Sequence, residues 1–106
     1  MQNRIYGYIG LAMKDGKIKA GEFSTEKSIK GGKARLVLVA EDASDNTIKK
    51  FSNSCLHYKV PFYTFGTKDE LGKIIGKEMR SSLSIEDEGF GKRIIGIMNG
   101  GNADVR

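Results

Sequence analysis

Hydrophobic residues recur along this chain at two different spacings, and the two spacings predict helices and strands in turn. Ile5, Ile9 and Ala12 recur every three or four residues, which predicts an amphipathic helix over residues 4–14. Residues 36–40 form an unbroken apolar run, Leu-Val-Leu-Val-Ala, which is typical of a strand buried on both faces. The first segment therefore needs one covered face, whereas the second has to lie inside the protein.

The same two patterns continue to the end of the chain. Further helices are expected over residues 22–31, from the N-cap Ser44 to Tyr58, from Thr67 to Gly76, and from Phe90 to Ile97. Further strands are expected over residues 17–20, 61–65 and 81–86. This alternation predicts an α/β fold, in which helices cover both faces of a mixed sheet. The length of 106 residues fits one domain, which we place at residues 1–98, followed by a flexible tail over 99–106.

The third expected helix has one apolar face. Ile48, Phe51, Cys55 and Tyr58 recur at helical spacing, so we expect all four side chains to face the core. On this face Cys55 is a small core residue and not a reactive nucleophile. Lys50 falls on the opposite side of the helix, which we expect to face solvent.

The fourth expected helix begins with a clear signal and contains two costly residues. Thr67 followed by Glu70 is a capping box. Gly72 and Gly76 lie on one face, and each glycine inside a helix costs about 1 kcal/mol relative to alanine. We expect close packing of the helix against the sheet to explain at least one glycine. We also expect the helix to stop at Gly76, which leaves residues 77–80 free to form a loop.

The overall charge is positive. The chain contains 18 Lys and Arg against 13 Asp and Glu, a net charge of +5, which favours an anionic partner such as nucleic acid. One cysteine excludes an internal disulfide framework and fits a reducing compartment, so we expect a cytoplasmic protein. No apolar stretch approaches 18 residues and residues 1–14 do not resemble a signal peptide, so no membrane association is expected.

Motifs for catalysis are missing from the sequence. The single histidine, His57, falls on the solvent side of a helix without an obvious partner. A phosphate-binding loop needs G-x-x-x-x-G-K-[ST], but the Gly-Lys pairs that end at Lys33, Lys77 and Lys92 continue with Ala, Glu and Arg. Acidic clusters beside expected helix starts are more common as charged turns than as magnesium sites. We therefore expect no enzymatic activity, no metal and no cofactor.

The second expected helix combines a glycine at its start with lysines on one face. Gly21 precedes the helix, and its free N–H groups and positive dipole end suit phosphate or base acceptors. Lys27 and Lys30 are three residues apart and share a face. Taken alone, these features favour a capped helix with a solvated lysine face over a binding site.

Three motifs in order along the chain change this balance. They are G-x-x-x-T-x-K from Gly21, G-K-A-R-L-V from Gly32, and E-L-G-x-x-x-G-K-x-x-R from Glu70. Together with the residues around them, in the segments 10–22, 27–44, 60–80 and 92–98, they resemble the kink-turn RNA-binding family of ribosomal proteins. The chain most resembles the small bacterial ribosomal-protein-like members of the YlxQ type.

The resemblance implies a fold and a function. Family members share a three-layer α/β/α sandwich around a four-stranded mixed sheet. The resemblance implies a non-enzymatic, monomeric protein that recognises a kink-turn in ribosomal or translation-linked RNA. In the family the start of the second helix reads tandem G·A pairs, and the loop after the fourth helix covers an extruded nucleotide.

The resemblance also implies the residues that contact RNA. By position they are Gly21, Glu22, Phe23, Ser24 and Lys27 at the second helix, Ser44 after the central strand, Lys68, and Lys77, Glu78, Met79 and Arg80 in the loop. We expect Lys27 and Arg80 to lie side by side at one edge of the sheet. Lys50 is expected to lie away from that edge.

One departure from the family pattern bears on function. The tightest kink-turn binders carry Asn-Glu where this chain carries Phe23-Ser24. A phenylalanine cannot hydrogen-bond a base edge, but its ring can stack on a base; alternatively, Phe23 packs against the protein near the helix start. The loss of Asn-Glu favours a second hypothesis, a protein-interaction module on the same fold. The retained cations oppose this hypothesis; they are Lys27, Lys68, Lys77 and Arg80. A small nucleotide-dependent enzyme is the weakest of the three hypotheses.

Overall fold

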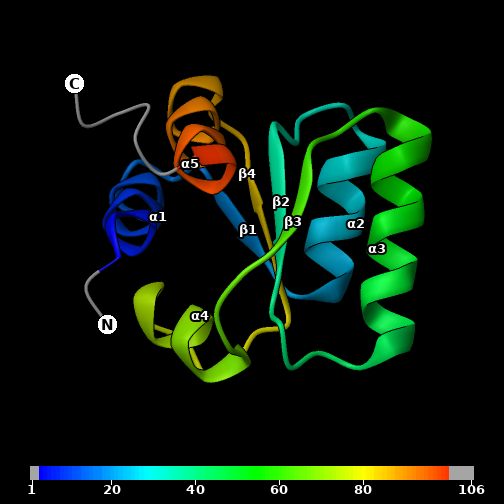
Figure 1. Ribbon diagram of the computed structural model, residues 1–106, viewed down its shortest axis with the longest axis horizontal. Helices are drawn as coiled ribbons and strands as arrows, with labels where there is room; N and C mark the ends of the chain where they lie inside the picture. Colours follow the sequence, from blue (N-terminus) through cyan, green and yellow to red (C-terminus); the bar gives the residue numbers. More distant parts are fainter. Residues whose placement is uncertain (1–2, 101–106) are drawn as a thin grey trace.

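The computed structural model describes residues 3–100, and its elements alternate between helix and strand in the expected order (Figure 1). In chain order they are α1 (Arg4–Lys14), β1 (Ile18–Ala20), α2 (Glu22–Lys30), β2 (Leu36–Val39), α3 (Asp45–Tyr58), β3 (Phe62–Thr64), α4 (Lys68–Ile74), β4 (Ser82–Ile85) and α5 (Glu88–Gly100). The strands are shorter than expected by one or two residues. Helix α5 includes Asn99 and Gly100, which the sequence assigned to the tail, and residues 101–106 lie outside the described residues.

The four strands form one mixed sheet between two layers of helices. The strand order is β1-β4-β2-β3, in which β2 and β3 run parallel and the other neighbours are antiparallel. Helices α2 and α3 cover one face of the sheet, and α1 and α5 lie on the other side with α4 below them (Figure 1). The expected three-layer α/β/α sandwich around a four-stranded mixed sheet is confirmed.

The two central strands are completely buried. All four residues of β2 are apolar, as the unbroken run predicts, whereas β4 places Ser82 and Ser84 in the core. These hydroxyls have partners on α2, because Ser82 donates to the Thr25 hydroxyl at 3.0 Å and Ser84 lies 2.7 Å from the Ser28 hydroxyl. Buried polar groups are stable only when they are hydrogen-bonded. The two pairs therefore fix where α2 rests on the sheet.

The apolar face of α3 agrees with the expectation except at its end. Phe51 and Cys55 are buried, and Ile48 packs partly against the core. Tyr58 is 43% exposed, so its placement in the core is wrong. It is the last residue of α3, after which Lys59 adopts a left-handed φ of 61° and turns the chain away. The hydrophobic core therefore ends before Tyr58, the last residue on the apolar face of α3.

The described residues contain neither a membrane-spanning helix nor a cluster of metal-ligating side chains. Within residues 3–100, no helix is long and apolar enough to span a membrane. The same residues hold no group of three His, Cys, Asp or Glu side chains that could share a metal ion.

The environment of Cys55 predicts an inert, structural thiol. The side chain is 1% exposed, and burial raises its pKa to about 12, so the reactive thiolate is scarce at neutral pH. A thiol reagent should react slowly with the folded protein and rapidly in urea. Cys55→Ala should lower the free energy of unfolding by about 0.5–1.5 kcal/mol, the usual cost of deleting one buried heavy atom. Equal reaction rates in the two conditions would contradict this assignment.

Candidate nucleic-acid interface

One edge of the sheet collects the segments that the sequence singles out. Strand β1 ends there, because Ala20 pairs with Leu83 near the start of β4. Strand β2 also ends there, because Val39 pairs with both Ser82 and Thr64. The N-termini of α2 and α3 and the loop that precedes β4 therefore open at this one edge, at the bottom of Figure 1. Helix N-termini carry partial positive charge, which favours anionic ligands.

Gly21 joins β1 to α2 in a conformation that only glycine adopts easily. Its φ is +94°, and its N–H donates to the Ser82 carbonyl at 3.0 Å. It makes no side-chain cap, so no capping oxygen of Gly21 occupies the first N–H groups of α2. A Cβ at Gly21 would lie 4.0 Å from Cδ of Arg80. The start of α2 and the residues after α4 are therefore side by side, as expected.

The loop over residues 77–80 folds back onto the helix that precedes it. A Cβ at Gly72 would lie 2.1 Å from the Glu78 carbonyl oxygen, so only glycine permits this contact. The Lys77 N–H donates to the Gly72 carbonyl at 2.8 Å. The expectation that α4 packs closely against the sheet through its glycines is wrong: Gly72 admits the backbone of the loop.

Gly76 has a different role from Gly72. A Cβ there would meet nothing within 4 Å, but its φ of +73° is in the left-handed region that favours glycine. The helix ends at Ile74, two residues earlier than expected, and Gly76 makes the turn into the loop. The two glycines thus reverse the chain and hold the reversed segment against α4.

Hydrogen bonds from backbone N–H groups connect the loop to the rest of the edge. The Arg80 N–H donates to the Lys68 carbonyl at 3.1 Å, and the Lys68 N–H donates to Oδ1 of Asp42 at 2.9 Å. These bonds join the segment after β2, the start of α4 and the loop. Ser44 caps α3, where its hydroxyl accepts from the Thr47 N–H at 3.1 Å.

The start of α4 is also held from α1. The expected capping box between Thr67 and Glu70 is present. The Tyr6 hydroxyl donates to the Glu70 carboxylate at 2.6 Å and lowers the pKa of Glu70. Burial, followed by the Glu70 hydrogen bond, raises the pKa of Tyr6 to about 12. The start of α4, which precedes the loop, is thus held in place by α1.

Two apolar side chains at this edge point into solvent. Phe23 is 79% exposed and Met79 is 56% exposed. The alternative that Phe23 packs against the protein is therefore wrong. Lys27, Lys77 and Glu78 are also exposed. Single exposed apolar residues are common, but here two of them accompany cations on adjacent segments.

Comparison with known proteins places the chain in a family. The family described as "Ribosomal protein L7Ae/L30e/S12e/Gadd45 family" matches residues 3–95. The chain is 40% identical over 91 residues to RNA-binding protein YlxQ of Bacillus subtilis (strain 168), across 86% of this chain and 91% of that protein. RNA-binding protein YlxQ of Enterococcus faecium is 40% identical over 92 residues, across 87% and 88% of the two chains.

A solved structure supports the fold independently. The Giardia lamblia 15.5kD RNA binding protein superposes with a TM-score of 0.79, across 93% of this chain and 91% of that chain, at 22% identity. The chain belongs to the L7Ae/L30e/S12e/Gadd45 family. The resemblance inferred from the three sequence motifs is therefore confirmed, including its likeness to YlxQ-type members.

Lys50 lies close to the start of α2, which the sequence did not predict. Its Nζ pairs with Oε2 of Glu22 at 2.7 Å, and this hydrogen bond raises the pKa of Lys50. The expectation that Lys50 is remote from the edge is wrong, because α3 packs beside α2 and reaches its first residue. The pair also occupies the carboxylate of Glu22, one of the expected site residues.

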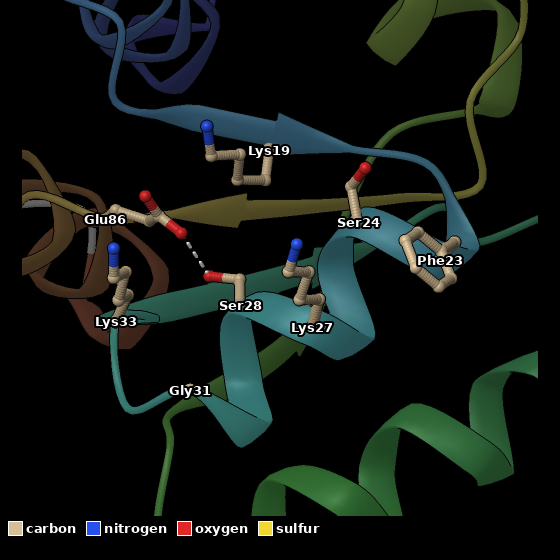
Figure 2. Close-up of a pocket in the computed structure, with 8 residues that line it drawn as sticks. All are labelled: Lys19, Phe23, Ser24, Lys27, Ser28, Gly31, Lys33 and Glu86. Carbon is tan, nitrogen blue, oxygen red and sulfur yellow. Dashed lines mark hydrogen bonds between the residues drawn. The ribbon is translucent and has the colours of Figure 1, made fainter.

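A groove beside α2 includes residues that the sequence did not indicate (Figure 2). Its volume is about 390 Å³. Its lining combines three expected site residues with others, in all Lys19, Phe23, Ser24, Lys27, Ser28, Gly31, Lys33 and Glu86. The local sequence signal for Lys19 is its alternation with the buried Ile18, which places it on the outer face of β1. Nothing local in the sequence links Glu86 to α2.

The contact at Gly72 predicts that alanine there displaces the loop. Gly72→Ala should lower the free energy of unfolding by about 1–3 kcal/mol, because the new methyl group overlaps the Glu78 carbonyl. Backbone chemical shifts of residues 77–80 should change most. Gly7→Ala is the matched control, since a Cβ in that part of α1 meets nothing within 4 Å, and it should raise stability by about 0.5–1 kcal/mol. Equal effects of the two changes would refute the close contact.

Proposed function

We propose that this protein is a non-enzymatic RNA-binding protein that recognises a kink-turn, or a similarly bent structure, in ribosomal or translation-linked RNA. The observation that carries the proposal is the convergence of two separate segments, the start of α2 and the loop over residues 77–80, at one edge of the sheet. Relatives named RNA-binding protein YlxQ, 40% identical to this chain, support it.

The chemistry of the edge suits a bent RNA. Cations for phosphates come from both segments and from the start of α4; they are Lys27, Lys68, Lys77 and Arg80. The uncapped start of α2 supplies backbone N–H groups. Exposed Met79 offers an apolar surface to an unstacked base, which a sharp bend in RNA exposes.

Phe23 and Ser24 change how a base pair would be read. Phe23 contributes stacking area but no hydrogen bond, and Ser24 contributes a hydroxyl in place of a carboxylate. We infer that this protein depends more on stacking and phosphate contacts than family members with Asn-Glu do. Its binding should accordingly tolerate more sequence variation in the RNA.

Arg80 is oriented before any ligand binds. Its Nη1 donates to the Glu78 carbonyl at 3.2 Å and to the Met79 carbonyl at 3.0 Å. The remaining guanidinium donors stay available, since the group carries five N–H donors. A guanidinium that is already ordered loses less conformational entropy on binding a phosphate.

The protein-interaction module remains the second candidate. Exposed Phe23 and Met79 favour it, since aromatic residues and Met are enriched at protein interfaces. The cations around these two residues favour RNA instead. We propose further that the protein acts as a cytoplasmic monomer and needs no cofactor.

Binding should depend on RNA shape and on salt. We expect a kink-turn RNA to bind more tightly than a straight duplex of equal length at the same salt concentration. The logarithm of the affinity should fall linearly with the logarithm of salt concentration, because phosphate contacts release counterions. Titrations monitored by fluorescence anisotropy measure both. Equal affinity for the two RNAs would leave only non-specific attraction and sink the proposal.

Two cations from different segments should act on one RNA. Lys27→Ala and Arg80→Ala should each weaken kink-turn binding about tenfold or more, because a charge-assisted hydrogen bond contributes roughly 1.5–3 kcal/mol. Lys92→Ala on α5 replaces Lys50→Ala as the control, because Lys92 pairs with Glu88 and α5 lies on the opposite side of the sheet from α2. A similar loss for Lys92→Ala would indicate a diffuse cationic surface.

A further inference from the structure

We propose that the RNA-binding surface continues from the start of α2 into the groove between α2 and β1, where it holds the backbone of a second stretch of RNA strand. This inference rests on the proposed function and extends its footprint to Lys19 and Lys33. Neither residue belongs to the two segments that converge at the sheet edge.

Three lysines from three different elements line the groove. Lys19 comes from β1, Lys27 from α2, and Lys33 from the connection between α2 and β2. Figure 2 shows the Lys27 and Lys33 side chains extending toward the side of the groove on which Glu86 lies, while the Lys19 side chain lies along β1. Strand β1 is the outermost strand of the sheet, so no further strand covers the groove on that side. Like charges repel at short range, and bringing three together favours an anionic ligand between them.

These three lysines have no acidic partner within residues 3–100, unlike the four lysines there that form ion pairs. Ion pairs there hold Lys30, Lys50, Lys73 and Lys92. Lys19, Lys27 and Lys33 form no ion pair or side-chain hydrogen bond within residues 3–100, although Glu86 lines the same groove. Their charges are therefore available for phosphate.

Hydrogen bonds hold Glu86 at the groove independently of these lysines. Its Oε2 accepts from the Ser28 hydroxyl at 2.6 Å (Figure 2). Ser28 has one hydroxyl proton, so when it donates to Glu86 it must accept from Ser84, 2.7 Å away. This chain of bonds begins in the buried core and ends at the groove. The Glu86 carboxylate is thus held in position by hydrogen bonds that lead from the protein core.

A fixed carboxylate among cations selects the kind of ligand. It repels a phosphate placed directly on it, so phosphates should lie against the surrounding lysines. Its free oxygen accepts a hydrogen bond, which a ribose 2′-hydroxyl or a base amino group donates. A strand of RNA carries both phosphates and such donors along its length.

The groove is continuous with the proposed RNA site. Phe23, Ser24 and Lys27 belong to both, and Gly31 and Lys33 mark the far end of the groove. Helix α2 has nine residues and is roughly 13 Å long. Phosphates along one strand of double-stranded DNA are about 3.4 Å apart along its axis, so a groove of this length can follow several phosphates of a nucleic-acid strand.

The test compares two forms of one kink-turn RNA, with long and with trimmed stems, against the full chain. Lys19→Ala/Lys33→Ala should lower affinity for the long form about tenfold or more and make its salt slope shallower by roughly 1–2. Affinity for the trimmed form should change less. Lys59→Asn/Lys92→Ala is the control of equal charge loss, since both side chains are exposed and Asn tolerates the left-handed φ at Lys59.

The outcomes separate this inference from the proposed function. If wild type prefers the kink-turn but the Lys19/Lys33 variant binds the long form as wild type does, the groove is not part of the footprint. An equal loss of affinity for the long form in the control variant would also overturn the inference about the groove. If wild type binds the kink-turn no better than a duplex, the proposed function fails and the groove inference fails with it. Thermal unfolding of each variant checks that the fold is intact.

Discussion

The position of α2 on β4 is the constraint on which the rest of the interface depends. Two hydroxyl pairs in the core, Thr25 with Ser82 and Ser28 with Ser84, join the helix to the strand. Each hydroxyl would be costly to bury alone, so sliding the helix along the strand would leave several of them unpaired. The N–H of Gly21 bonds to the carbonyl of the same Ser82 and adds a third restraint at the start of the helix.

The second segment of the interface is held by a different device. The loop after α4 lies against the backbone of its own helix because Gly72 has no side chain. Arg80 then reaches Gly21 at the start of α2, which β4 has already positioned. Both segments are thus ordered before a ligand arrives, which reduces the entropy that binding would cost.

The charges of the protein are arranged by pairing as much as by number. Ion pairs with acidic side chains involve Lys30, Lys50, Lys73 and Lys92. Exposed ion pairs of this kind contribute little to stability. The cations left without partners include those beside α2 and β1. A net charge of +5 therefore understates how strongly this one side can attract an anion.

The sequence by itself determined the order of helices and strands, the buried central strand and the family, because periodicity and ordered motifs are local properties of a chain. Only the tertiary structure decided which distant residues meet. Lys50 reaches Glu22 because α3 packs against α2, and Glu86 joins the groove through Ser28. Tyr58 follows the helical pattern yet lies where the core has ended. Periodicity gives the direction of a side chain, whereas the packing of other elements decides what lies in that direction.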